Sequence, residues 1–152
     1  MPDSAAAHLR GRLGQQLACS DWITLDQARI DAFAHATGDH YWIHTDPGRA
    51  RAEGRLGTTI AHGFLTLSLL APSCLDALLG TLGGTEVLNY GMEALRFLAP
   101  VRCGERVRCA VALGEVNARP DGRFLLGLDC TVEIDGQDRP ALVARALMLF
   151  TC

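Results

Sequence analysis

The stretch IAHGFLTLSLLAPSCLDALL, residues 60–79, contains the longest apolar run of the chain. Its apolar side chains would cover nearly every face of a helix beginning near His62, which predicts a buried helix. Pro72 removes the backbone donor for the Ser68 carbonyl, so we expect a kink or break there. The helix should end by Gly80. Polar residues interrupt the apolar run, which we expect to be too short to span a bilayer.

Four β-rich runs follow this helix. They cover residues 87–95, 106–114, 124–134 and 141–150, and Pro, Gly and Asp residues separate them. Imperfect alternation of apolar and polar residues is typical of long antiparallel strands with one covered face. A shorter strand is expected within 17–23. This order predicts an α+β fold in which the apolar helix packs against the concave face of the sheet.

Length and composition indicate one domain of ordinary globular character. The chain has 152 residues. We expect a flexible N-terminal segment over 1–15 and a single domain over 16–152. The N-terminus lacks the apolar core of a signal peptide, so the expected location is the cytoplasm. Six scattered cysteines are interpreted as reduced core thiols, and no metal site is predicted.

The charge pattern bears on partners. A net charge of −3 argues against a nucleic-acid partner, because binding phosphate backbones requires a basic face. Arginine supplies nearly all of the positive charge. Two groups stand out: Arg49, Arg51 and Arg55, and Arg96, Arg102, Arg106 and Arg108. These are either solvated edge charges or contacts for a few phosphates of a small ligand.

Helix signals place the candidate site in loops. Thr24 to Gln27 has the form of a capping box, and the helix that it would start ends near Gly38. Asp39 then lies in a loop just past the helix end. Asp46-Pro47 is a second helix start, with Asp as the N-cap and Pro at the first helical position.

Asp39 and His44 are candidates for general acid–base catalysis, since a carboxylate and an imidazole can together hold a water and move its protons. The spacing alone also fits a turn cap and a surface imidazole. Gly63 would offer an unpaired backbone N–H at the helix start, which suits an oxygen that gains charge. It could equally serve close helix–sheet packing. His62 is interpreted as structural, orienting the turn.

Three blocks resemble the MaoC-like dehydratases, the (R)-specific enoyl-CoA hydratases of the hotdog fold, particularly the branch that includes nodulation protein N. The family signature G-D-x-N-P-x-H appears here as GDHYWIH, residues 38–44. The I-A-H-G block and its following hydroxyl residue appear as IAHGFLT, residues 60–66. The R-F-x-x-P-V-x-x-G strand appears at residues 96–104. The resemblance covers roughly residues 20–150.

This resemblance implies a hotdog fold, an antiparallel sheet wrapped around a central, mainly apolar helix. It implies that Asp39 and His44 hold the water and that the Gly63 N–H holds the thioester oxygen while water adds across the α,β double bond. Which of Asp39 and His44 is the base stays open. The resemblance implies no cofactor beyond the coenzyme A of the substrate, and no metal.

The chain departs from the family pattern beside the pair. Tyr41 stands where the family has Asn, and Trp42 stands where it has Pro. These aromatic residues put the shape of the acyl pocket in question more than the reaction class. Besides Gly63 and His62, the candidate substrate-binding residues are Tyr41, Trp42, Phe64 and Thr66.

Two other functions remain open. One is a hotdog acyl-CoA thioesterase, although such enzymes usually lack the Asp-x4-His pair followed by I-A-H-G. The other is a non-catalytic acyl-thioester-binding subunit, against which the retention of Asp39 and His44 argues. The expected ligand is an acyl-CoA or acyl carrier protein thioester, without nucleic acid or membrane. A homodimer is expected, because edge-to-edge pairing would cover an exposed edge strand.

Overall fold

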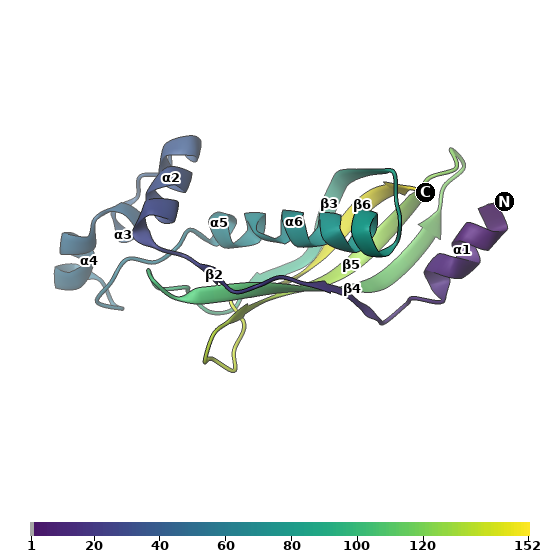
Figure 1. The fold of residues 1–152 in the computed structure, drawn as a ribbon. Coiled ribbons are helices and arrows are strands. Elements are labelled where there is room, and N and C mark those ends of the chain that lie inside the picture. Colours follow the sequence, from purple (N-terminus) through teal and green to yellow (C-terminus); the bar gives the residue numbers. More distant parts are fainter. Residues whose placement is uncertain (1) are drawn as a thin grey trace.

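The computed structural model describes residues 2–152 and is built on one antiparallel sheet (Figure 1). Its strands are β1 (Gln16–Cys19), β2 (Ile23–Thr24), β3 (Glu86–Phe97), β4 (Arg106–Ala118), β5 (Phe124–Ile134) and β6 (Leu142–Thr151). Their order is β1-β4-β5-β6-β3, and β2 also pairs with β4. The four predicted long strands are therefore confirmed. The predicted first strand is divided into β1 and β2, both paired with β4.

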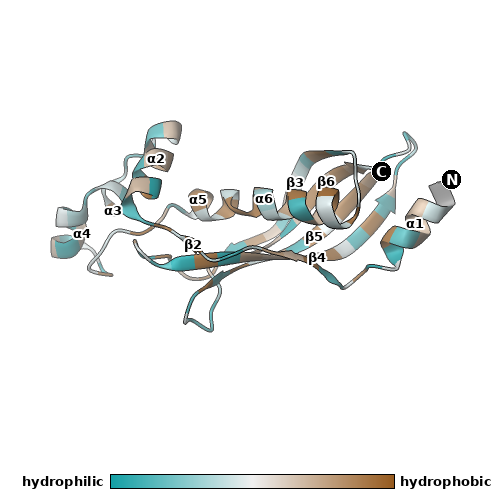
Figure 2. Cartoon of the chain, in the orientation of Figure 1, coloured by the Kyte–Doolittle hydropathy of each residue, from teal (hydrophilic) through white to brown (hydrophobic). Residues whose placement is uncertain are grey.

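The apolar stretch forms the helix that crosses the sheet. It consists of α5 (Gly63–Ser68), α6 (Leu70–Leu75) and a π-helical end, η1 (Asp76–Thr81). The break at Leu69 lies where Pro72 leaves the Ser68 carbonyl without its helical donor. Apolar residues run along this helix and along the strands beneath it (Figure 2).

The prediction that this helix is buried on nearly all faces is wrong. Leu65, Leu70 and Leu78 are buried against the sheet, whereas Leu75 and Leu79 are 42% and 40% exposed. The reason is that a single sheet covers only one side of the helix. Gly63–Thr81 is also long and apolar enough to cross a membrane, contrary to the expectation from its interrupted apolar run. In this fold it serves as the core helix.

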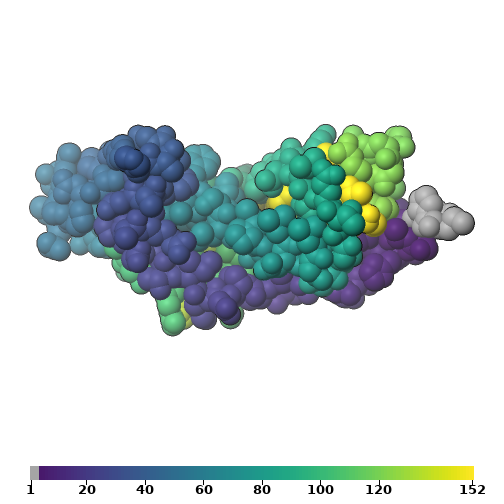
Figure 3. All heavy atoms as spheres, turned by 45° about the horizontal axis from the view of Figure 1, so that its top comes forward, coloured from purple at the N-terminus to yellow at the C-terminus, as the bar shows by residue number. Residues whose placement is uncertain are grey.

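Three short helices lie together beyond one end of the sheet (Figures 1 and 3). They are α2 (Gln27–Thr37), α3 (Trp42–Thr45) and α4 (Pro47–Glu53). Asp46 caps α4 as predicted, by accepting a hydrogen bond from the Arg49 N–H at 2.9 Å. The predicted capping box at Thr24 is wrong: Asp26 is the N-cap of α2 and accepts from the Arg29 N–H. Gln27 is thereby free for other contacts.

The N-terminal segment contains a helix, α1 (Pro2–Arg10), at the other end of the sheet. Leu9 is 1% exposed and belongs to the main hydrophobic core, and Ala6 is buried beside it. This packing joins part of the segment that we expected to be flexible, over 1–15, to the domain. Met1 lies outside the described residues.

The turn between the helix and β3 predicts a packing constraint at Gly84. A Cβ at this position would overlap the buried Phe150 ring. Gly84→Ala should therefore lower the free energy of unfolding by about 1–3 kcal/mol, measured by urea denaturation. Gly80→Ala is the matched control, because no atom lies within 4 Å of a Cβ there. Equal stability of the two variants would contradict this account.

Candidate active site

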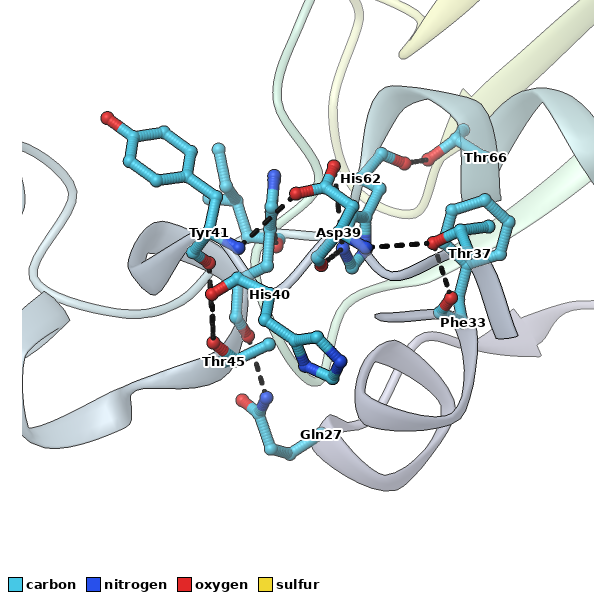
Figure 4. A network of polar contacts seen from close by, with 11 residues as sticks. Gln27, Phe33, Thr37, Asp39, His40, Tyr41, Thr45, His62 and Thr66 are labelled. Carbon is cyan, nitrogen blue, oxygen red and sulfur yellow. Dashed lines mark hydrogen bonds and ion pairs between the residues drawn. The ribbon is translucent and has the colours of Figure 1, made fainter. Parts of the chain in front are cut away.

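The candidate site forms where the α2–α3 loop, helix α3 and the segment before α5 meet (Figure 4). Gly38 ends α2 in the left-handed conformation, with φ at 80°, and its N–H donates to the Ala34 carbonyl. This conformation favours glycine, and it ends α2 and turns the chain into the loop that contains Asp39. Asp39 therefore lies in the loop that the sequence predicted.

Local hydrogen bonds hold the Asp39 loop. The Asp39 N–H contacts the Thr37 hydroxyl at 3.4 Å, and the Asp39 carboxylate accepts from the Tyr41 N–H at 3.3 Å. The second bond is the side-chain turn that Asp commonly makes with the backbone two residues on. The Asp39 side chain remains 51% exposed. Its carboxylate is thus fixed by the backbone yet accessible to water.

His44 lies on α3 and is 8% exposed. Its Nδ1 lies 2.7 Å from the Ile60 carbonyl oxygen, so Nδ1 carries the hydrogen and donates it. Burial lowers the pKa of His44, and the bond to Ile60 opposes this shift without overcoming it. The lowered pKa favours the uncharged ring, in which Nε2 carries no hydrogen.

His62 supports both members of the pair. Its Nε2 donates to the Asp39 carbonyl oxygen at 2.9 Å, and its ring stacks on that of His44 with centroids 3.9 Å apart. The side chain is 2% exposed. Nδ1 has no hydrogen-bond partner among the described residues. These contacts attach His62 to the Asp39 backbone and to the His44 ring, and its structural role stays a prediction.

Gly63 and His44 line the same cavity, of about 250 Å³. The cavity also contacts Thr66, Phe97 and Val101. As the first residue of α5, Gly63 has a backbone N–H without an intrahelical acceptor, and the preceding His62 makes no side-chain cap. The Phe97 ring would lie 3.1 Å from a Cβ at this position. Both interpretations of the glycine, an oxyanion donor and close packing, therefore fit its surroundings.

The other predicted substrate-binding residues separate into two groups. Thr66 is buried at the cavity, and its hydroxyl donates to the His62 carbonyl at 3.3 Å. Tyr41 is 55% exposed and lies edge-on to the His44 ring, with centroids 6.2 Å apart. Phe64 is 67% exposed, points away from the sheet core and contacts Phe97 edge-on. Of Thr66, Tyr41 and Phe64, only Thr66 is buried.

Trp42 lines a second, larger cavity of about 580 Å³. Most of its lining is apolar, with two charged residues: Trp42, Ile43, Ala50, Glu53, Gly54, Arg55, Leu56, Thr58, Ile60 and Pro100. Ile60 and Pro100 also line the cavity that contains His44. The two hollows therefore adjoin each other. The Arg49 guanidinium stacks over the Trp42 ring at 4.4 Å and holds it in place.

Asp39, His44 and His62 lie close enough together to be considered as metal ligands. A carboxylate oxygen and one nitrogen from each ring lie within 4.8 Å of one another. A metal would require the in-plane lone pairs of both rings to converge on one point. The rings instead stack with centroids 3.9 Å apart and planes 25° apart, so their lone pairs lie in two separate, nearly parallel planes. This geometry fits a metal poorly.

Sequence reasoning missed two residues behind His44. Gln27 Nε2 donates to the His44 carbonyl at 2.8 Å, and the Thr59 hydroxyl donates to Gln27 Oε1 at 2.6 Å. Thr59 is 1% exposed. The capping-box pattern assigned Gln27 to its own helix end and so concealed this role. A threonine immediately before the I-A-H-G block was the one available signal.

The comparisons with known proteins place this chain in a family. Residues 8–123 match the MaoC like domain, and the chain belongs to the MaoC-like dehydratase family. It is 44% identical over 144 residues to nodulation protein N of Rhizobium leguminosarum bv. viciae, covering 95% of this chain and 89% of that protein. It is 42% identical over 146 residues to 3-hydroxyacyl-thioester dehydratase Z of Mycobacterium tuberculosis, covering 96% and 95%.

Solved structures confirm the hotdog fold. An R-hydratase of Pseudomonas aeruginosa gives a TM-score of 0.75 at 22% identity, covering 91% of this chain and 81% of that chain. An (R)-hydratase of A. caviae involved in PHA biosynthesis gives 0.73 at 25% identity, covering 90% and 94%. The predicted family and fold are therefore both correct.

The burial of His44 predicts the direction of its pKa shift, and its bond to Ile60 predicts which ring nitrogen carries the hydrogen. Its NMR titration midpoint should lie below the usual histidine pKa of about 6.5, with the hydrogen on Nδ1. Because the folded-state pKa is lowered, the unfolded chain binds more protons in this range. The contribution of His44 to stability is therefore complete above about pH 6.5 and is lost as the pH falls through the folded-state pKa. A midpoint above 6.5, or a hydrogen on Nε2, would contradict this prediction.

Proposed function

We propose that this protein is an (R)-specific enoyl-CoA hydratase, or 3-hydroxyacyl-thioester dehydratase, that adds water across the α,β double bond of an enoyl thioester. The observation that carries the proposal is His44, with Nδ1 bonded to the Ile60 carbonyl and Nε2 left as an acceptor, beside the Asp39 carboxylate and in one cavity with Gly63. Family membership and the named dehydratase relative support the reaction class.

His44 is the proposed base. The bond from Nδ1 to Ile60 leaves Nε2 as the acceptor for a water proton. The water oxygen bonds to the β-carbon as the π electrons move toward the thioester. The proton taken by Nε2 is then delivered to the α-carbon, so hydroxyl and hydrogen from one water are both accounted for. This assigns the proton transfers that the sequence left open.

Asp39 and Gly63 complete the proposed mechanism. The Asp39 carboxylate accepts the second hydrogen of the water and offsets the charge of the transient imidazolium. The Gly63 N–H holds the thioester oxygen as it acquires enolate charge, at the positive end of the helix. Each group acts on a charge that develops during the reaction. No cofactor is required by these steps.

The larger cavity is the proposed acyl site. It adjoins the catalytic cavity at Ile60 and Pro100, and its apolar lining matches a hydrocarbon chain. Its volume of about 580 Å³ exceeds what a four-carbon acyl group fills. Arg55 lines the same cavity and is a candidate contact for the phosphates of the carrier.

Activity tests the proposal directly. The protein should hydrate crotonyl-CoA and longer enoyl-CoAs, with loss of the conjugated enoyl absorbance, an (R)-hydroxy product and no released thiol. Asp39→Asn and His44→Ala should each lower kcat by at least about a hundredfold. His40→Ala is the matched control, because the exposed His40 side chain lies in the same loop.

Other outcomes would identify the alternatives. Thiol release without loss of the enoyl absorbance would indicate the thioesterase. Thioester binding without either reaction would indicate a non-catalytic subunit. Near-normal turnover in Asp39→Asn or His44→Ala would remove that residue from the mechanism.

We also propose a homodimer joined along β3. This twelve-residue strand lies at one edge of the sheet. It exposes Leu88, Tyr90 and Met92 by 41% to 54%. The exposed Leu75 and Leu79 of the core helix form a second unpartnered apolar surface. A second copy paired at this edge would satisfy the free backbone groups and bury apolar surface near Phe97 and the site.

The dimer predicts a change in mass on disrupting β3. The wild-type protein should sediment as a dimer, and the double substitution Leu88→Asp with Tyr90→Asp should produce monomers, because it buries charge at the interface. Ala118→Asp, at an exposed position on β4, should remain dimeric. A monomeric wild type in analytical ultracentrifugation would exclude the homodimer.

A further inference from the structure

Gln27 connects three elements of the site through one amide group. It occupies the first position of α2, which the Asp26 cap fixes. Its Nε2 donates to the His44 carbonyl at 2.8 Å and to the Asp31 carboxylate at 2.8 Å. Its Oε1 accepts from the Thr59 hydroxyl at 2.6 Å. Figure 4 shows Gln27 at the bottom of the view, in the same group of polar contacts as Asp39 and His62.

The partners determine the orientation of this amide. The His44 carbonyl and the Asp31 carboxylate can only accept hydrogen bonds, so the NH₂ group must face them. The Thr59 hydroxyl faces Oε1 and donates to it. A flipped amide would place oxygen against two acceptors. Glutamine is therefore matched to this position in a way that glutamate or alanine is not.

The amide holds together the two backbone segments that orient the His44 ring. One is α3, through the His44 carbonyl. The other is Thr59, whose neighbour Ile60 accepts from His44 Nδ1 and donates its N–H to the Ile43 carbonyl at 3.1 Å. The bond from His44 Nδ1 to the Ile60 carbonyl spans these two segments, so its length depends on how far apart they lie. Loss of the amide would loosen that bond and admit water to the ring.

We infer that Gln27 is a positioning residue for catalysis, which acts by fixing the location of His44 relative to Ile60. This inference rests on the proposed function for its kinetic consequences, but its structural consequence at His44 can be measured without any reaction. Gln27 does not line the cavity that contains His44 and Gly63, so it acts through His44 rather than on substrate.

The charged and titratable groups around His44 come from several elements. Asp39 and Tyr41 face it from the α2–α3 loop, and His62 stacks on it from the segment before α5. The segment that connects β3 to β4 lines the His44 cavity with apolar residues: Leu98, Ala99 and Val101. Removing the Gln27 amide changes none of these charges. A change in His44 titration would therefore report its burial and its bond to Ile60.

The experiment compares Gln27→Ala and Gln27→Glu with Asp31→Ala. Glutamate keeps an acceptor for Thr59 but presents oxygen to the His44 carbonyl. Both Gln27 variants should lower kcat about tenfold or more, with KM changed by less than about threefold, as expected for a misplaced catalytic group. The His44 NMR midpoint should rise toward the ordinary histidine value in Gln27→Ala, which introduces no charge, and the acid limb of the kcat/KM profile should move with it. Only Gln27→Ala is used for the titration, because the new carboxylate of Gln27→Glu would itself raise the pKa of His44.

Asp31→Ala is the control, since it removes an exposed partner of the same amide but keeps the bond to His44. It should leave kcat and the His44 midpoint unchanged. The His44 signal is assigned by its loss in His44→Gln, and thermal unfolding verifies that each variant is folded. If a Gln27 variant fails to fold, Thr59→Val tests the same connection from its other end.

An unchanged His44 midpoint in folded Gln27→Ala would overturn the inference, whatever its activity. So would an equal shift in Asp31→Ala. A shifted midpoint in a protein without hydratase activity would support the positioning role while the proposed function fails, so the two failures are distinguishable.

Discussion

The hydrogen bond from His44 Nδ1 to the Ile60 carbonyl is the constraint on which the site depends. It requires α3 and the segment around Ile60 to lie side by side. That segment is in turn attached to the connection between β3 and β4, because the Ala61 N–H donates to the Val101 carbonyl at 2.8 Å and Ile60 forms an isolated β-bridge with Arg102. The position of the Ile60 carbonyl, held by this connection, therefore determines which nitrogen of His44 is free to react.

Local sequence signals predicted the parts of the fold that depend on local chemistry. The alternating strands, the Asp46 cap and the turn at Gly38 each need only a few neighbouring residues. The exposed side of the core helix could not be predicted in this way, because it depends on how many faces the sheet covers. An exposed apolar residue and one buried in the core look the same in the sequence.

The candidate site shows the same division. The Asp39 and His44 spacing, the Gly63 position and the family blocks predicted residues that the structure brings close together: Asp39 lies beside His44, and His44 and Gly63 line one cavity. The role of Gln27 was not predicted, because its hydrogen-bond partners His44 and Thr59 are 17 and 32 positions away in the sequence. Side-chain bonds over such separations leave no periodicity. Thr24 offered a nearer partner that satisfied a common pattern, and Asp26 took the capping position instead.

The placement of α2, α3 and α4 beyond the end of the sheet has a consequence for how this protein loses activity. Ala34 and Ala50 are buried among these helices, outside the main core that the sheet and its helix share. Such a peripheral group can open as a cooperative unit of its own while the sheet persists. Ile30 of α2 belongs to that core, whereas α3 and α4 contribute no residue to it, so we expect amide hydrogens in α3 and α4 to exchange with solvent before those of β4 and β5. Disruption of the candidate site and global denaturation are then separate events.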